Sequence, residues 1–165
     1  MEGSPREVPM SSRSAVVLLI EDDPNDVLFL KRAFKKAGVT LPVRVAGDGQ
    51  KAIDYLLRAA RAEDPEHYPM PCIVVLDLKI PKRSGLEVLE WLRHHEEFRD
   101  LPVVMVTSSG EAEDRRRVMH HGVEAYHVKP VTFEELLDLA REIRGEVEDH
   151  CKDAAPCPPE EDVKG

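Results

Sequence analysis

The stretch Ile73-Val-Val-Leu-Asp77-Leu-Lys-Ile-Pro81 decides the fold. Its first four residues are apolar without alternation, which is typical of a strand covered by helices on both faces, as in a parallel sheet. The run ends in Asp77, a carboxylate whose burial costs free energy unless it has a partner. We therefore predict a central parallel strand that delivers Asp77 to one edge of the sheet.

Three other apolar runs also end in polar side chains. Glu21 and Asp22 follow the first run, Thr107 ends the second and Lys129 follows the third. In open parallel sheets, ligands bind outside the carboxyl ends of the strands. We therefore expect these side chains to share one crevice with Asp77.

Short β-branched runs alternate with amphipathic stretches along the chain. The local signals agree with this division, because Asp23-Pro24 suits a helix start, Gly38 and Gly122 suit helix ends, and Thr132-Phe-Glu-Glu135 suits a capping box. The five successive βα units predict an α/β fold with a doubly wound parallel sheet. The expected strands are 15–20, 43–46, 72–77, 102–107 and 124–128, and the expected helices are 24–37, 49–61, 84–97, 111–121 and 132–148.

The 165 residues suit one domain, which we place at 14–149, and leave no room for a second full domain. The ends, 1–13 and 150–165, are rich in Pro, Ser or acidic residues without periodicity, so we expect disordered tails. No apolar run reaches the roughly 18 residues that span a membrane, and no secretion signal opens the chain. These features predict a cytoplasmic protein.

The net charge of −9 disfavours nucleic-acid phosphates, so we expect no direct DNA binding. The three cysteines, Cys72, Cys151 and Cys157, have no metal-ligand spacing and are expected to be free thiols.

The polar residues at the strand ends favour phosphoryl chemistry at a divalent cation. Asp22 and Asp77 offer oxygen ligands for Mg²⁺, with Mn²⁺ as a substitute, and Glu21 would act through water. Beside such a cation, Asp77 can attack phosphorus as a nucleophile. The ammonium of Lys129 and the hydroxyl of Thr107 can then bind two phosphoryl oxygens.

These motifs resemble those of bacterial response-regulator receiver domains. The similarity runs from about Ala15 to Val147, and it implies a flavodoxin-like, CheY-like sheet with strand order 2-1-3-4-5. Within the family, the chain is most similar to free-standing regulators partnered with phytochrome-type histidine kinases. The matching motifs are Glu21-Asp22-Asp23, Asp77 with Pro81 and Gly85, Thr107-Ser108, Tyr126 and Lys129-Pro130, and the narrower similarity rests on 21–26, 58–71 and 129–134.

The resemblance also implies specific roles. Asp77 would accept the phosphoryl group, and Asp22, Asp77 and the backbone carbonyl of Lys79 would bind Mg²⁺, with Glu21 behind them. Tyr126 would swing inward when Thr107 moves toward the phosphoryl group. The resemblance further implies a cis peptide bond between Lys129 and Pro130.

Two positions depart from the family pattern, Lys79 and Ser84, which flank the expected pocket. Our hypothesis is that Lys79 folds inward, weakens Mg²⁺ binding and changes the lifetime of the phosphoryl group.

The expected last helix carries a second apolar strip, formed by Phe133 and Leu137, beside the strip that packs on the sheet. A second strip indicates self-association, and the resemblance implies relatives that form dimers through this region. We therefore predict a homodimer through this helix.

The sequence thus predicts a single-domain response regulator without an output domain of its own. It would accept a phosphoryl group from a histidine kinase on Asp77, lose it slowly, and signal to an unknown downstream protein. Such a chain is a phosphoacceptor switch and not an enzyme acting on a free substrate. The alternatives are a phosphate-independent pseudo-receiver, and a phosphatase or phosphotransferase, which the absence of an acid at Lys79 disfavours.

Overall fold

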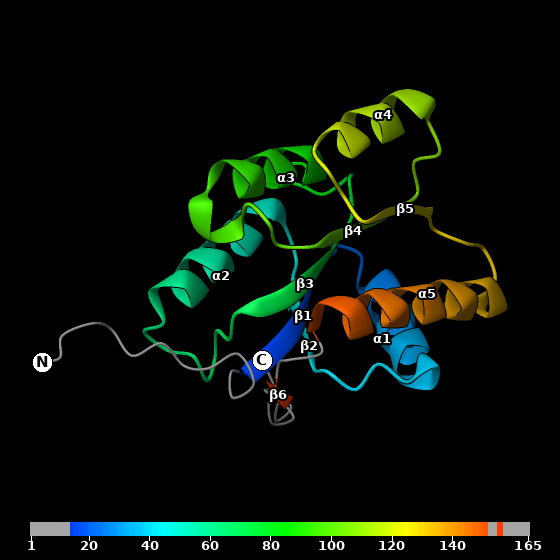
Figure 1. Cartoon of the computed structure of the whole chain (residues 1–165). Helices are drawn as coiled ribbons and strands as arrows, with labels where there is room; N and C mark the ends of the chain where they lie inside the picture. The colour runs from blue at the N-terminus through cyan, green and yellow to red at the C-terminus, as the bar shows by residue number, and fades with distance from the viewer. Residues whose placement is uncertain (1–13, 152–154, 157–165) are drawn as a thin grey trace, which may run out of the picture.

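The computed structural model describes residues 14–151 and 155–156 and has the expected α/β architecture. A parallel sheet in the order β2-β1-β3-β4-β5 confirms the predicted topology (Figure 1). The strands are β1 (Ser14–Ile20), β2 (Val43–Ala46), β3 (Pro71–Leu76), β4 (Val103–Thr107) and β5 (Ala125–Val128). The helices are α1 (Pro24–Ala37), α2 (Gly49–Arg61), α3 (Gly85–His94), α4 (Ala112–His120) and α5 (Phe133–Cys151), and a 3₁₀ turn η2 (Glu96–Phe98) follows α3.

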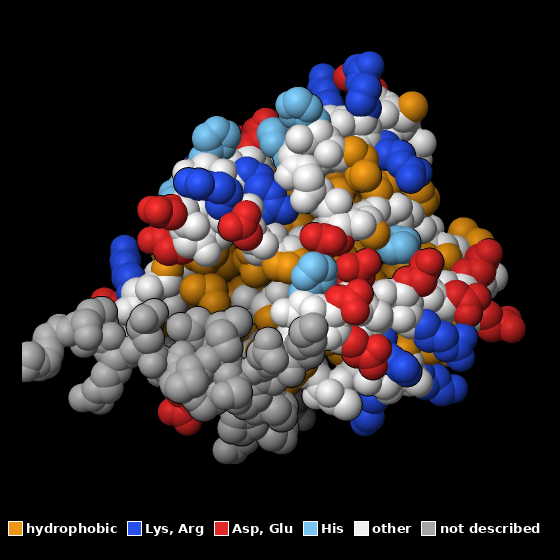
Figure 2. Space-filling model, viewed as in Figure 1, with side chains coloured by type: hydrophobic (Ala, Val, Ile, Leu, Met, Phe, Trp, Pro, Cys, Tyr) orange, Lys and Arg blue, Asp and Glu red, His pale blue; other side chains and the backbone are white. Residues whose placement is uncertain are grey.

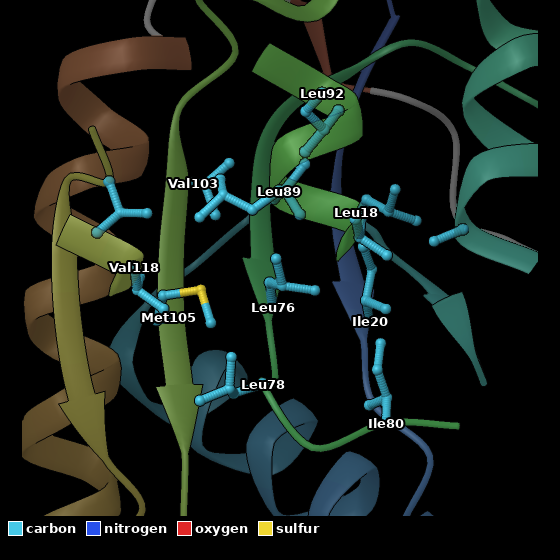
Figure 3. Packing of buried hydrophobic residues seen from close by; sticks show 14 of the residues in the cluster. Leu18, Ile20, Leu76, Leu78, Ile80, Leu89, Leu92, Val103, Met105 and Val118 are labelled. Atoms are coloured by element: carbon cyan, nitrogen blue, oxygen red, sulfur yellow. The ribbon is translucent and has the colours of Figure 1, made fainter. Parts of the chain in front are cut away.

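Helices cover both faces of the sheet, with α1 and α5 on one face and α2, α3 and α4 on the other (Figure 1). Alternate residues of β1 divide between the two layers, because successive strand side chains point to opposite faces. Val17 and Leu19 pack with α1 and α5, whereas Leu18 and Ile20 pack in the layer that Figure 3 shows with Leu89 of α3. Helices on both faces of the sheet therefore explain why β3 is apolar throughout, as predicted, and the same holds for β1.

The ends of α1 follow from local chemistry, as the sequence predicts. The side chain of Asp23 accepts a hydrogen bond from the Asn25 amide at 2.8 Å, and Pro24 occupies the first turn. At the other end, Gly38 has φ +93°, a left-handed conformation that glycine adopts without the penalty of a Cβ atom.

The start of α5 shows part of the predicted capping box. The hydroxyl of Thr132 accepts a hydrogen bond from the Glu135 amide at 3.1 Å, while the Glu135 carboxylate accepts from the same hydroxyl. A complete capping box forms instead at α3, where Ser84 and Glu87 each accept a backbone hydrogen bond from the other. Ser84, one of the two departures, therefore has a structural role as a helix cap.

Helix α3 ends earlier than expected, because the backbone at His95 is extended and only the short turn η2 follows. That turn carries Phe98 into the core, where its side chain is 1% exposed. In contrast, α5 continues past the expected end at 148 to Cys151, and Val147 and Cys151 are buried. Burial of the last turn explains the extra length.

The domain boundary expected at 149 thus falls within the last turn of α5. Beyond α5, Ala155 and Pro156 form a two-residue strand, β6, that pairs with Ser14 and Ala15. This pairing is available because β1 begins before its pairing with β2 and β3. The rest of both expected tails, residues 1–13, 152–154 and 157–165, lies outside the described residues.

The expectation of free thiols is wrong for two of the three cysteines, since Cys72 and Cys151 form a disulfide. Their Cα atoms lie 5.6 Å apart although 79 positions separate them in the sequence. The helix length that brings Cys151 to the start of β3 was not visible in the spacing. Cys157 lies outside the described residues.

The bond predicts a measurable stabilisation, because it closes a long loop in the unfolded chain. Cys151→Ser should lower the free energy of unfolding by about 2–4 kcal/mol, as measured by denaturant unfolding of protein whose oxidation is checked by thiol alkylation and intact mass. Cys157→Ser is the matched control and should unfold like the wild type. Equal stability of the two variants would contradict the prediction.

Candidate functional site

Asp77 directly follows β3 and lies at the carboxyl edge of the sheet. Its side chain is buried, and its amide donates a hydrogen bond to the Ile20 carbonyl at 3.0 Å, which ties the ends of β3 and β1 together. The chain then turns so tightly that a Cβ atom on Gly85 would lie 2.2 Å from the Asp77 carbonyl oxygen. Glycine at position 85 is therefore required for this turn.

The acidic residues that follow β1 converge on Asp77 as predicted. Glu21, Asp22 and Asp77 each have a carboxylate oxygen within 4.8 Å of those of the other two. Glu21 is buried (2% exposed), whereas Asp22 is exposed. The group thus combines two buried carboxylates with one that contacts solvent.

Lys129, just after β5, connects this group. Its Nζ lies 2.5 Å from Glu21 Oε1, 2.9 Å from Asp77 Oδ2 and 2.7 Å from Asp26 Oδ2. Asp26, in the first turn of α1, is a partner that the sequence reasoning missed. Its position in the first turn of α1 could have indicated this contact. Side chains on a helix tilt toward its N-terminus, and this end of α1 faces the crevice.

The site has unusual proton affinities. Burial raises the pKa of Glu21 to about 7, against the lowering effect of Lys129, and the charge of Asp77 adds to the rise. Burial lowers the pKa of Lys129, but contacts with Asp26, Glu21 and Asp77 outweigh this and raise it above its ordinary value. The ammonium of Lys129 therefore stays charged at neutral pH.

Thr107 ends β4 beside this group and is fully buried. Its Oγ1 accepts a hydrogen bond from the Ser109 amide at 3.3 Å, and its carbonyl accepts one from the Lys129 amide at 2.7 Å. Tyr126 of β5 is also buried, and its hydroxyl donates to the Ser109 carbonyl at 2.9 Å. Ser109 therefore links the two residues expected to switch, which the sequence did not indicate.

Lys79 has a different position from the one we hypothesised. Its amide donates to Asp77 Oδ1 at 3.3 Å, but its ammonium lies 3.6 Å from Asp114 of α4 and its side chain is 62% exposed. The side chain thus lies outside the acidic group because α4 supplies an anion at the surface. Its backbone carbonyl remains the expected metal ligand.

The cis peptide bond expected between Lys129 and Pro130 is wrong, since every peptide bond among residues 14–151 and 155–156 is trans. The trans form is the more stable isomer by about 0.5–1 kcal/mol before proline. Lys129 reaches its three acidic partners with this isomer.

The donor set fits a hard divalent cation. The ammonium of Lys129 contacts three carboxylates, those of Glu21, Asp26 and Asp77, and Asp22 adds a fourth beside them, so the group keeps excess negative charge. Oxygen donors at this spacing suit Mg²⁺ or Mn²⁺, which keep several waters. The exposed side of the group, at Asp22, is where such waters have access.

A model of the family described as "Response regulator receiver domain" matches residues 17–141. The chain belongs to the response regulator receiver domain family. The probable methanogenesis regulatory protein FilR2 of Methanothrix harundinacea is 36% identical over 129 residues, which are 78% of this chain and 81% of FilR2. Receiver domains bind Mg²⁺ in their acidic site, in agreement with the donor set described above.

Solved structures of receiver domains include regulators from light signalling. The bacteriophytochrome response regulator AtBRR is 38% identical, with a TM-score of 0.64 over 81% of this chain and 94% of AtBRR. Response regulator RPA3017, from red light signalling of R. palustris, is 30% identical, with a TM-score of 0.72 over 86% of this chain and 96% of RPA3017. The receiver fold and the family predicted from the motifs are thereby confirmed.

The raised pKa of Glu21 predicts a pH-dependent stability of the metal-free receiver domain. Because its pKa is about 7 when folded and 4.5 when unfolded, the folded state holds the extra proton between these values. The associated stabilisation is complete below pH 4.5 and is lost as the pH rises through 7. Relative to Glu21→Gln, the wild type should lose up to about 1.4 kcal/mol of unfolding free energy per pH unit in this window.

Denaturant unfolding in the presence of a chelator, between pH 5 and 8, measures this difference. Glu63→Gln, which changes an exposed carboxylate in the α2–β3 connection, is the control and should parallel the wild type. A stability difference between wild type and Glu21→Gln that does not change with pH would contradict the assignment.

Proposed function

We propose that this receiver domain is a phosphoacceptor switch in which Asp77 takes a phosphoryl group from a phosphohistidine of a sensor kinase. The observation that carries the proposal is the contact of the Lys129 ammonium with Asp77, within a group of acids that fits a divalent cation. A cation directed at the carboxylate from one side favours the negative charge that a phosphoryl group brings.

In the transfer, an Asp77 oxygen forms a bond to phosphorus while the nitrogen–phosphorus bond of the donor breaks. The electron pair of that bond stays on the imidazole nitrogen, which then takes a proton. Lys129 holds Asp77 by Oδ2 and donates to a phosphoryl oxygen, and the Thr107 hydroxyl donates to another. Slow attack of water on phosphorus breaks the bond between phosphorus and the Asp77 oxygen, which releases inorganic phosphate and returns Asp77 to a carboxylate.

Asp22, Asp77 and the Lys79 carbonyl would hold Mg²⁺, with Glu21 acting through a bound water, and Mn²⁺ would substitute. The cation supplies positive charge that offsets repulsion between the carboxylate and the incoming phosphoryl group. Glu21 is buried and Asp22 is exposed, so the Asp22 side of the site would be open to the waters of a bound cation.

Signalling would follow from movement of the loop between β4 and α4. When Thr107 moves toward the phosphoryl group, its contact with the Ser109 amide changes, and Tyr126 is tied to the carbonyl of the same residue. The two switch residues are therefore coupled through one residue. A downstream protein would read the altered surface around α4 and β5.

A surface beside the site suits the kinase. A cavity of about 190 Å³ between α1 and the start of α5 is lined by Asp26 and Lys129 and by the exposed aromatic residues Phe29 and Phe133. A kinase helix seated there would place its phosphohistidine near Asp77. The similarity to AtBRR and RPA3017 supports a kinase of the phytochrome type.

The surface also argues against a nucleic-acid partner. Acidic side chains gather over α5 in Figure 2, and this helix carries seven acidic residues and two arginines. Among the described helices, none has the length and apolar composition needed to cross a bilayer. We place the protein in the cytoplasm, where its kinase would phosphorylate it. Disulfides are rare in that compartment, so the Cys72–Cys151 bond stands against this location, and the redox state of the two cysteines in cells tests it.

Phosphorylation is the decisive test. Incubation with acetyl phosphate and Mg²⁺ should add one phosphoryl group to the wild type, measured as intact mass, because Asp77 is the nucleophile. Asp77→Asn and a chelated sample should show no addition, and Lys129→Met should be labelled at least about tenfold more slowly, since a buried charge contact of about 1.4 kcal/mol or more is lost.

The control is Lys51→Met, at an exposed lysine of α2, which should be labelled like the wild type. An unlabelled wild type, with a known receiver domain labelled in the same tube, would overturn the proposed function. It would then favour the phosphate-independent pseudo-receiver.

We also propose a homodimer through α5. Phe133 is 39% exposed at the start of this helix, whereas Leu137 already packs in part against the core. The self-association strip is therefore centred on Phe133, and Leu137 contributes only its exposed part. Phe133 also lines the cavity proposed for the kinase, so the dimer and the kinase complex would exclude one another.

Light scattering tests the dimer. The wild type should have twice the chain mass of 18.6 kDa, and Phe133→Asp, a residue that suits the first turn of a helix, should have the mass of one chain. Leu28→Ser, at an exposed leucine of α1, is the control and should stay dimeric. A wild type with the mass of one chain would refute self-association.

A further inference from the structure

Helix α4 has little apolar attachment to the rest of the receiver domain. Val118 is its one buried residue, whereas each of the other four helices buries four or five. Figure 3 shows Val118 reaching the core beside Met105. Polar contacts at the two ends of α4 must therefore contribute strongly to its position.

The end of α4 is held by the guanidinium of Arg93 from α3. Arg93 Nε donates to the His121 carbonyl at 2.8 Å, and Nη2 donates to the Gly122 carbonyl at 3.1 Å. Burial lowers the pKa of Arg93, yet an arginine remains charged throughout the accessible pH range. This end of the helix is thus fixed by donors that phosphorylation does not touch.

The start of α4 is held differently, through Asp114. Asp114 Oδ2 accepts a hydrogen bond from Ser109 Oγ at 2.6 Å and lies 3.6 Å from the ammonium of Lys79. The Ser109 hydrogen bond and the charge of Lys79 lower the pKa of Asp114. One oxygen of α4 therefore connects with both the loop after Asp77 and the loop after Thr107.

The position of Lys79 makes its contact exchangeable. Its amide already bonds to Asp77 Oδ1, the oxygen that Lys129 does not contact, so the side chain starts next to the phosphorylation site. The side chain is 62% exposed, and an ion pair of this kind changes an equilibrium by only about two- to fivefold. A phosphoryl group with up to about two negative charges would compete strongly for this ammonium.

We propose that Lys79 is a latch on α4 that phosphorylation releases. Its ammonium binds Asp114 while Asp77 is a free carboxylate, and it moves to the phosphoryl group once Asp77 is modified. Asp114 then loses its cation, and the start of α4 becomes free to shift with Thr107 and Tyr126. The inference rests on the proposed function, and it makes Lys79 a positioning residue of α4 in addition to a backbone ligand.

Amide hydrogen exchange of the full chain, read over 110–118, tests the latch. Without a phosphoryl donor, Lys79→Gln and Asp114→Asn should each raise exchange about two- to fivefold, and the double variant should raise it no further, because both remove the same contact. Lys82→Gln is the matched control. Lys82 lies in the same loop, but its ion pair is with Asp48 at 3.8 Å and not with α4, so exchange over 110–118 should stay unchanged.

With acetyl phosphate and Mg²⁺, amide hydrogen exchange over 110–118 should rise about two- to fivefold in the wild type. In Lys79→Gln, the phosphoryl donor should not raise this exchange further. The charge-swapped variant Lys79→Glu/Asp114→Lys restores the ion pair but not the hydrogen bond that Asp114 accepts from Ser109, so its exchange without donor should be lower than that of Asp114→Lys alone. An acid at position 79 cannot move to a phosphoryl group, so phosphorylation should leave exchange over 110–118 unchanged in this variant. A loss of packing alone would not be rescued by the swap.

Intact mass from the same samples separates the two proposals. A wild type that takes no phosphoryl group would overturn the proposed function and the release step with it. Labelled wild type and labelled Lys79→Gln that show equal increases would overturn the latch alone, since Thr107 and Tyr126 would then carry the movement. Unchanged exchange in Lys79→Gln and Asp114→Asn without donor would also overturn it.

Discussion

The structure of the site depends on the ammonium of Lys129, whose side chain is partly buried. Removing a lysine and several carboxylates from water costs several kcal/mol per ion, and only close contacts of opposite charge offset that cost. Lys129 provides these contacts to Glu21 after β1, Asp77 after β3 and Asp26 on α1. One side chain, directly after the edge strand β5, therefore holds the ends of β1 and β3 and the start of α1 together.

This constraint divides the receiver domain into a firmly held part and a loosely held part. The ends of β1 and β3 are joined by the Asp77 amide and by Lys129, and their strands are buried on both faces. The loop from Thr107 to α4 is held instead by polar contacts of Ser109 with Thr107, Tyr126 and Asp114. Elements with few buried contacts open at low free energy, so a charge added at Asp77 should displace this loop before it displaces the strands.

The Cys72–Cys151 bond lies at the other end of the sheet from this site. It joins the start of β3 to the last residue of α5, whereas Asp77 follows the end of β3. The start of α5 lies beside the site through Pro130 and Thr132, which line the same cavity as Lys129. Helix α5 is thus anchored covalently at its far end and lies next to Lys129 at its near end.

The sequence by itself determined the strands, the caps at the two ends of α1 and the edge of the sheet at which the polar residues meet. These features are local, because apolar periodicity sets which face of an element is buried and a residue such as Asp23 caps its own helix. The motif resemblance added the family, and Glu21, Asp22, Asp77, Thr107 and Lys129 lie together as expected.

Only the tertiary structure decided which partners these side chains choose. Asp26 and Lys129 are 103 positions apart, Cys72 and Cys151 are 79 apart, and Lys79 turns to Asp114 on another helix. A long flexible side chain can reach any of several neighbouring charges, and periodicity does not encode which is nearest. That choice is made by the packing of α1, α4 and α5 around the sheet, which brings distant residues within contact distance.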